Sequence, residues 1–198
     1  IGTTNEYTIK HNITTTDTIN LEKIEYIKHF AFYFGAGFNY RQMYGVSAMA
    51  GCILWNIDLQ ASYTLGLGSS DPVRWYTADD NVAYMSSVTY KRSTFAAKLG
   101  YQIRLTERLG ITPQVGYHIE QLTGTVIDGT NLYGDKASAS CVSASAKFIY
   151  APLRHFQLFI APEFSLGLTK DDEFNRIDAA SDIAAGGFMI SAGAFLSF

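Results

Sequence analysis

The sequence has little of what marks several common protein classes. Only 4 of its 198 residues are proline, so few positions interrupt regular structure. No apolar run approaches the roughly 18 residues that a membrane-spanning helix needs. Charged residues make up 17% of the chain and the net charge is −3, without a clustered basic stripe, which argues against nucleic acid as a partner. At 47% hydrophobic residues, the composition also does not fit a disordered chain.

Cysteine is scarce as well. Cys52 and Cys141 lie far apart and match no metal-binding or redox spacing. They could form a structural disulfide, although we favour two buried thiols. The chain begins at Ile1 without a Met, so we expect it to be processed or truncated, and the missing signal peptide says nothing about secretion.

Aromatic residues are abundant, with 13 Tyr and 13 Phe, and from Phe30 onward apolar and polar residues alternate with a period of two, which predicts β-strands. Two more segments, Tyr44–Leu54 and Ala137–Ala151, are assigned as strands mainly by position. In the six clearest segments the apolar face takes alternate residues of Phe30–Tyr40, Ile57–Leu67, Phe95–Leu105, Ile111–Ile119, Phe156–Leu168 and Phe188–Phe198.

The connections between these eight segments differ in length. Short ones fall around Gln42, near Trp55, at Thr106–Gly110 and at Pro152–His155, whereas Gly68–Ala83, Gly124–Lys136 and Thr169–Ala185 are long and polar. Short turns at one end and long loops at the other are typical of outer-membrane barrels. We therefore predict an all-β fold, a transmembrane antiparallel up-and-down β-barrel of about eight strands, with both termini on the periplasmic side.

A soluble β-sandwich also alternates apolar and polar residues, so other features decide between the two folds. The apolar faces are long and aromatic, and the polar faces combine small residues with charges that suit a narrow lumen. Strands that face lipid must also close on themselves. Aromatic residues gather near the predicted segment ends, as interfacial girdles do: Tyr40, Tyr44, Trp55, Tyr84, Tyr90, Tyr150, Phe156 and Phe198.

We divide the chain into two parts. Residues 1–28 are polar and Thr-rich without sustained alternation, and we interpret them as a periplasmic N-terminal segment or the end of a preceding domain. Residues 29–198 form the predicted barrel.

The barrel part resembles the OmpA/OmpX-type family of eight-stranded outer-membrane β-barrels. Its most specific element is the ending from Phe188 to Phe198, with apolar residues at alternate positions and a terminal Phe. The strand style also resembles barrels of the Bacteroidota. The resemblance implies a Gram-negative outer membrane, contact with its lipid and lipopolysaccharide, and recognition of Phe198 by the barrel-assembly machinery.

The inward-facing charges are the candidate site. We expect them to pair and hydrogen-bond, because an unpaired buried charge is costly, and we place Lys98 about opposite His118. We interpret the set as a structural network; a proton-linked or catalytic cluster is the alternative. We assign no catalytic, cofactor-binding or metal-binding residue. The predicted lumen network consists of Lys98, Arg104, His118, Glu120 and Glu163.

The predicted outer loops lack His, which argues against a His-based catalytic triad at the rim. Their acids could bind a divalent cation together with lipopolysaccharide, although solvated loop acids are more common: Asp71, Asp79, Asp80, Asp171, Asp172 and Glu173.

These features favour a non-enzymatic barrel with a structural or protein-interaction role, as a free-standing protein or a subunit of a larger outer-membrane complex. The alternatives are a small-solute channel, which a narrow eight-strand lumen disfavours, and an outer-membrane lipid-modifying enzyme.

Overall fold

The computed structural model describes residues 28, 30–69, 73–79, 82–126, 136–172, 174–175 and 183–198. The predicted N-terminal segment, residues 1–28, lies outside this set except for Lys28, so its assignment stays a prediction. The strands are β1 (Phe30–Arg41), β2 (Met43–Leu54), β3 (Ile57–Gly66), β4 (Val73–Asp79), β5 (Val82–Tyr101), β6 (Ile103–Arg104), β7 (Leu109–Val126), β8 (Lys136–Tyr150), β9 (Phe156–Lys170) and β10 (Gly186–Ser197).

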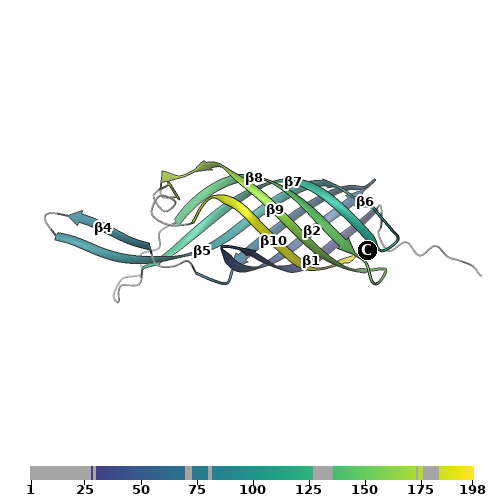
Figure 1. Ribbon diagram of the computed structural model, residues 1–198, viewed down its shortest axis with the longest axis horizontal. Coiled ribbons are helices and arrows are strands. Elements are labelled where there is room, and N and C mark those ends of the chain that lie inside the picture. Colours follow the sequence, from purple (N-terminus) through teal and green to yellow (C-terminus); the bar gives the residue numbers. More distant parts are fainter. Residues whose placement is uncertain are drawn as a thin grey trace, which may run out of the picture.

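Eight of these strands close into an antiparallel barrel, as predicted (Figure 1). The ring order is β1-β2-β3-β5-β7-β8-β9-β10, and β10 pairs with β1 to close it. The short β6 continues β5 after Gln102 and pairs with β7. β4 pairs only with the outer part of β5, so it adds a hairpin to the barrel and no wall strand.

The alternation seen in the sequence becomes the two faces of the barrel wall. The predicted apolar residues face outward; Phe34, Leu99 and Phe188, for example, are all at least half exposed. Polar and small residues alternate with them and face the lumen. Such a surface is untenable in water but fits a bilayer, where only closed barrels and helices satisfy their backbone.

Among the described residues, no helix combines the length and apolar character needed to cross a bilayer.

The tight turn between β2 and β3 carries an interfacial aromatic. Trp55 and Asn56 both have positive φ, 48° and 71°, the conformation of a type I′ hairpin turn. Trp55 is 85% exposed. It follows Leu54, which pairs with Phe30, and the backbone of Phe198 is hydrogen-bonded to that of Phe32, so Trp55 and Phe198 lie at the same end of the barrel. At the opposite end Tyr40 and Tyr44 pair across β1 and β2 with ring centroids 4.9 Å apart.

Two predictions about the outer end are wrong. The segment Gly68–Ala83 contains β4, and β5 begins at Val82 instead of Phe95. The polar, weakly alternating stretch before Phe95 hides a strand that extends past the apolar belt, where no lipid imposes alternation. Tyr90 does not belong to an aromatic girdle, because its side chain is completely buried in the lumen. Its even-numbered position places it on the inward face of β5.

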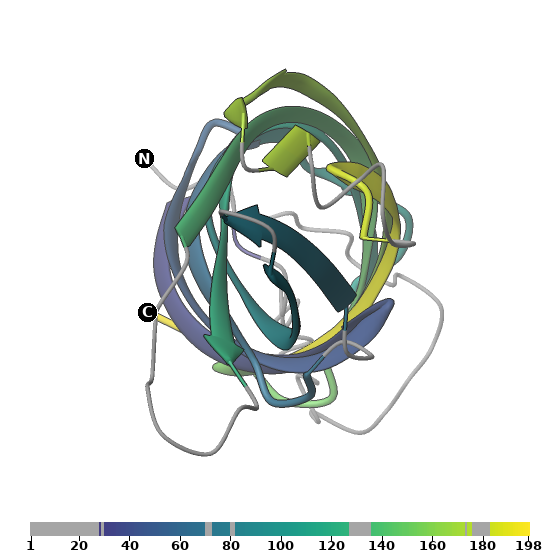
Figure 2. The ribbon, with the colours of Figure 1, turned by 90° about the vertical axis from the view of Figure 1, so that its left-hand side faces the viewer.

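Apolar side chains fill both ends of the lumen. Near the short turns, Tyr33, Met49, Phe159 and Phe195 belong to one buried cluster. At the opposite end, Tyr90 and Leu122 pack with Phe174 and Ile183 from the connection between β9 and β10. Figure 2 looks onto this end. Phe174 is fully buried, so its side chain helps to fill this end of the lumen.

A glycine makes room for the largest side chain of the inner cluster. A Cβ at Gly51 would lie 2.5 Å from the Tyr33 hydroxyl and 2.4 Å from the carbonyl oxygen of Leu59. Gly51 and Tyr33 are paired across β2 and β1. The glycine therefore allows the Tyr33 ring to lie against the barrel wall.

We predict that Leu99→Arg destabilises the barrel by about 2–4 kcal/mol, because Leu99 faces lipid near the middle of the apolar stretch of β5. Leu105→Arg, close to the short turn at the membrane edge, should cost no more than about 1 kcal/mol. Equilibrium unfolding in lipid vesicles measures both. Equal costs at the two positions would contradict the membrane placement.

Candidate functional site

The charged side chains inside the barrel form three groups that reach across the lumen. In the group nearest the short turns, Lys147 of β8 donates to Asp58 of β3 at 2.6 Å. Lys147 also donates to Gln60 at 2.9 Å, and Tyr33 donates its hydroxyl to Asp58 at 2.7 Å. Gln114 of β7 donates at 3.0 Å to Asp58 Oδ2, the oxygen that also accepts from Lys147. Four wall strands are thereby joined through one buried carboxylate.

The second group spans the full width of the barrel. Arg41 of β1 forms a buried ion pair with Glu120 of β7, and these strands are opposite each other in the ring β1-β2-β3-β5-β7. Arg92 of β5 approaches the other oxygen of Glu120 at 3.8 Å. His118 Nε2 lies 2.9 Å from Glu120 Oε1, and the Cys141 thiol donates to the same oxygen at 3.5 Å.

The third group adjoins the second at His118. Lys98 of β5 pairs with Glu163 of β9, and Glu163 Oε1 lies 4.0 Å from His118 Nδ1. His118 thus lies between two carboxylates, one on its own strand and one across the lumen. Every one of these charged side chains is at most 10% exposed.

The structure brings four of the five predicted network residues together: Lys98, His118, Glu120 and Glu163. Arg104 is separate, because it pairs with Gly110 on β6 and β7, eight residues along β7 from His118. Lys98 is also not directly opposite His118; it pairs with Gly116, and Ala96 pairs with His118. The assignment of the five residues as a structural network stays a prediction.

Sequence reasoning missed the partners that cross the lumen. Arg41 lies at an inward position in the alternation of β1, but this position does not identify Glu120 as its partner. Lys147 was overlooked because it lies in a Ser- and Ala-rich segment whose alternation is weak. Its inward parity, which it shares with Ser143 and Ile149, was the signal that could have found it.

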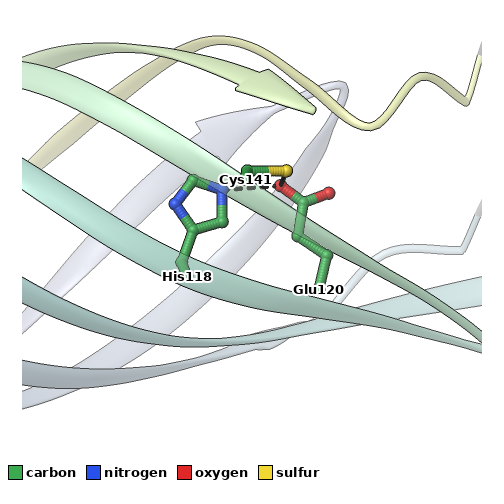
Figure 3. Close-up of side chains that lie close together, drawn as sticks. All are labelled: His118, Glu120 and Cys141. Carbon is green, nitrogen blue, oxygen red and sulfur yellow. Dashed lines mark hydrogen bonds and ion pairs between the residues drawn. The ribbon is translucent and has the colours of Figure 1, made fainter. Parts of the chain in front are cut away.

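His118, Glu120 and Cys141 are the one described trio whose chemistry suggests a metal (Figure 3). Their ligand atoms lie within 4.8 Å of one another, and imidazole, carboxylate and thiolate are all zinc ligands. However, the Glu120 oxygen that would bind the ion already accepts from Arg41. Together, the second and third groups hold two carboxylates, Glu120 and Glu163, and three cations: Arg41, Arg92 and Lys98. A divalent cation would add to this positive excess, so the residues fit an ion-pair network better.

The same trio contains a thiol, an imidazole and a carboxylate, as a nucleophilic site would. Cys141 and Glu120 are fully buried and His118 is 2% exposed. The thiol donates to the carboxylate and not to the imidazole, and Phe174 belongs to the apolar cluster toward the outer end of the lumen. In this arrangement all three groups are buried, and the thiol is paired with a carboxylate.

Both cysteines are free thiols, so the disulfide alternative is wrong. Cys141 is buried as expected, whereas Cys52 faces outward from β2 and is only partly buried. Of the predicted rim acids, Asp171 accepts hydrogen bonds from the backbone N–H groups of Ser138 and Phe174 at 2.6 and 2.7 Å. Asp71, Asp80 and Glu173 lie outside the described residues.

We predict that Glu120→Gln destabilises the barrel by about 3–5 kcal/mol, because it leaves buried guanidinium groups without their carboxylate. The double variant Arg41→Gln/Glu120→Gln restores the original charge balance and should lose less than the single variant. Glu107→Gln, in an exposed turn, should stay within about 0.5 kcal/mol of the wild type. Denaturant unfolding in vesicles tests this, and a double variant weaker than the single one would contradict it.

Comparisons with known proteins identify the fold. No family model and no curated protein matches the sequence. Among solved structures, a major outer-membrane protein from Thermus thermophilus is similar with a TM-score of 0.63 and 11% identity, over 86% of this chain and 100% of that one. Neisserial surface protein A is similar with a TM-score of 0.50 and 13% identity, over 86% and 98%. The chain thus has the fold of the OmpA/OmpX-type eight-stranded outer-membrane β-barrels.

Proposed function

We propose that this chain is a non-enzymatic outer-membrane barrel that presents a β-ribbon to a protein partner outside the membrane. The proposal combines two properties of the molecule, a lumen filled by its own side chains and a two-stranded extension at the end opposite Phe198 (Figure 1). The extension carries the proposal, and the filled lumen makes the competing role of a channel the weaker one.

The lumen is blocked by contacts that cross it. Arg41 and Glu120 join opposite sides of the ring, and Lys147 and Asp58 join β8 to β3. Apolar clusters lie at both ends of these charges. An ion or solute would have to break buried ion pairs to pass, which is costly in a low-dielectric interior.

The ribbon is formed by β4 and the first part of β5. All of β4 pairs with Val82–Val88, while pairing of β5 with β7 begins only at Val88. Among the described residues, residues 82–87 therefore pair with β4 alone, and both edges of the ribbon are open. Figure 1 shows it extending beyond the barrel wall. An isolated two-stranded hairpin is marginally stable in water, so a partner that adds to an edge would stabilise it.

The residue types of the ribbon are those that proteins use to bind one another. Its sequence includes Arg74, Trp75, Tyr76 and Tyr84, and Trp, Tyr and Arg are enriched in interaction hot spots. An open strand edge offers main-chain hydrogen bonds to an added strand. A subunit role in a larger outer-membrane complex would use the same surface.

The filled lumen predicts that the purified protein gives no steady conductance in planar bilayers. A variant with Arg41→Ser, Glu120→Ser and Phe174→Ser removes a crossing pair and part of the outer apolar cluster, and it should conduct more than the wild type. Single-channel recording compares the two proteins. Reproducible steps of one size from the wild type would favour the channel alternative.

The ribbon predicts a partner that depends on it. Full-length protein is isolated in mild detergent from its native envelope, beside a variant in which residues 73–87 are replaced by a Gly-Ser linker. A partner recovered stoichiometrically with the wild type should fall at least about tenfold with the variant, since hot-spot losses reach several kcal/mol.

The matched control replaces residues 127–135 with the same linker. Heat-dependent gel mobility checks that each variant still forms a barrel. Equal recovery of the partner with and without the ribbon, or recovery of the barrel alone, would contradict the proposal.

A further inference from the structure

A groove lies on the outer surface of the barrel, near the end that carries the ribbon. Its volume is about 680 Å³, and side chains of β3, β5, β7 and β8 line it. It arises because these strands end at different heights. β3 ends at Gly66, and its last pair with β5 is Leu65 with Ser93, whereas the β5–β7 pairing runs on to Val88 and Val126.

Two lysines lie side by side in this groove. Lys91 of β5 pairs with Thr123 of β7, and Thr123 pairs with Lys136 of β8. All three residues are exposed, so they form one outward row. Adjacent strands are about 4.8 Å apart, so the two lysines flank the threonine hydroxyl at a spacing that lets both ammonium groups reach one phosphate.

The neighbouring rows set the depth of the lysines in the membrane. The next row toward the barrel centre is polar, with Ser93 paired to Gln121, and the row after it is Phe95 paired to Ile119, both exposed to lipid. Lys91 and Phe95 are four positions apart on β5. Their separation is about 13 Å along the strand, and it is about 10 Å along the membrane normal at the usual strand tilt. The lysines thus lie at headgroup level, above an apolar wall.

The groove also offers an apolar surface below the charge. Tyr63 and Leu65 of β3 line it and are about half exposed. Among the described residues, the Asp171 carboxylate contacts Ser138, which lines the groove, and it accepts from the Ser138 hydroxyl and from the backbone N–H groups of Ser138 and Phe174. These three donors occupy both oxygens of Asp171, while Lys91 and Lys136 line the groove.

We propose that this groove binds the phosphate of an anionic lipid through Lys91 and Lys136, with an acyl chain of the same lipid against Tyr63 and Leu65. The two lysines match the negative charge of a lipid phosphate, and the polar and apolar rows below them match the rest of a lipid molecule. A soluble anion would make no contact with the apolar wall, so an anionic lipid is the occupant that we propose. The inference depends on the membrane setting of the barrel and not on a protein partner for the ribbon.

The test uses the full chain in nanodiscs of phosphatidylcholine with a minor fraction of phosphatidic acid. Native mass spectrometry of the released barrel measures which lipid stays bound. The wild type should retain phosphatidic acid over phosphatidylcholine by about thirtyfold, the size expected for two lysines near an anionic membrane surface. The variant Lys91→Gln/Lys136→Gln should retain the two lipids in their bulk ratio.

The control Arg108→Gln/Arg154→Gln removes the same charge from exposed turns at the opposite end, and it should behave like the wild type. Gel mobility confirms that every variant is folded. Equal retention by the wild type and the lysine variant overturns the proposal. So does displacement of the lipid by inorganic phosphate at the same concentration, because the groove would then recognise an anion alone.

Discussion

The first and last strands of the barrel pair from Tyr33 with Ser197 to Tyr40 with Ile190, and this pairing closes the sheet. Closure turns a two-residue alternation into an outside and an inside. Once β1 and β10 are joined, no backbone edge of the wall faces lipid, so the strands can carry Phe, Leu and Ile outward across the bilayer. Closure also confines the inward side chains to a narrow lumen, where they contact one another.

The charges inside follow from that confinement. Each carboxylate in the lumen has a cation within reach, often from a strand that is distant in the ring, because neighbouring inward positions hold small residues such as Gly51 and Gly116. Arg41 and Glu120 face each other across the whole barrel. The same confinement buries His118 and Cys141 among the side chains that contact them.

The sequence predicted well which face of the wall a residue occupies, because this depends on alternation. It predicted poorly which residues meet across the lumen, because these lie on strands that are far apart in the chain. Which residues of β1, β3 and β9 face outward follows from parity, and so does the inward direction of His118 and Glu120. The pairing of Lys147 with Asp58 does not follow, because these residues lie on strands that are not neighbours and meet only through the curvature and stagger of the closed wall. β4 was missed because outside the bilayer a strand need not alternate, and Tyr90 because a girdle aromatic and a lumen aromatic differ only by one position.

The unequal strand lengths connect the fold to its surroundings. If β3 were as long as β5 and β7, the outer surface would have neither the groove beside Lys91 nor the step at its rim. If β5 began where its pairing with β7 begins, at Val88, there would be no ribbon. The ribbon and the row of lysines lie beyond the part of the wall whose outer face contacts lipid and whose inner face contacts the filled lumen. Among the described residues, the interior is filled by ion pairs, and these two extensions are the surfaces that we propose for binding, one for a lipid headgroup and one for a protein outside the membrane.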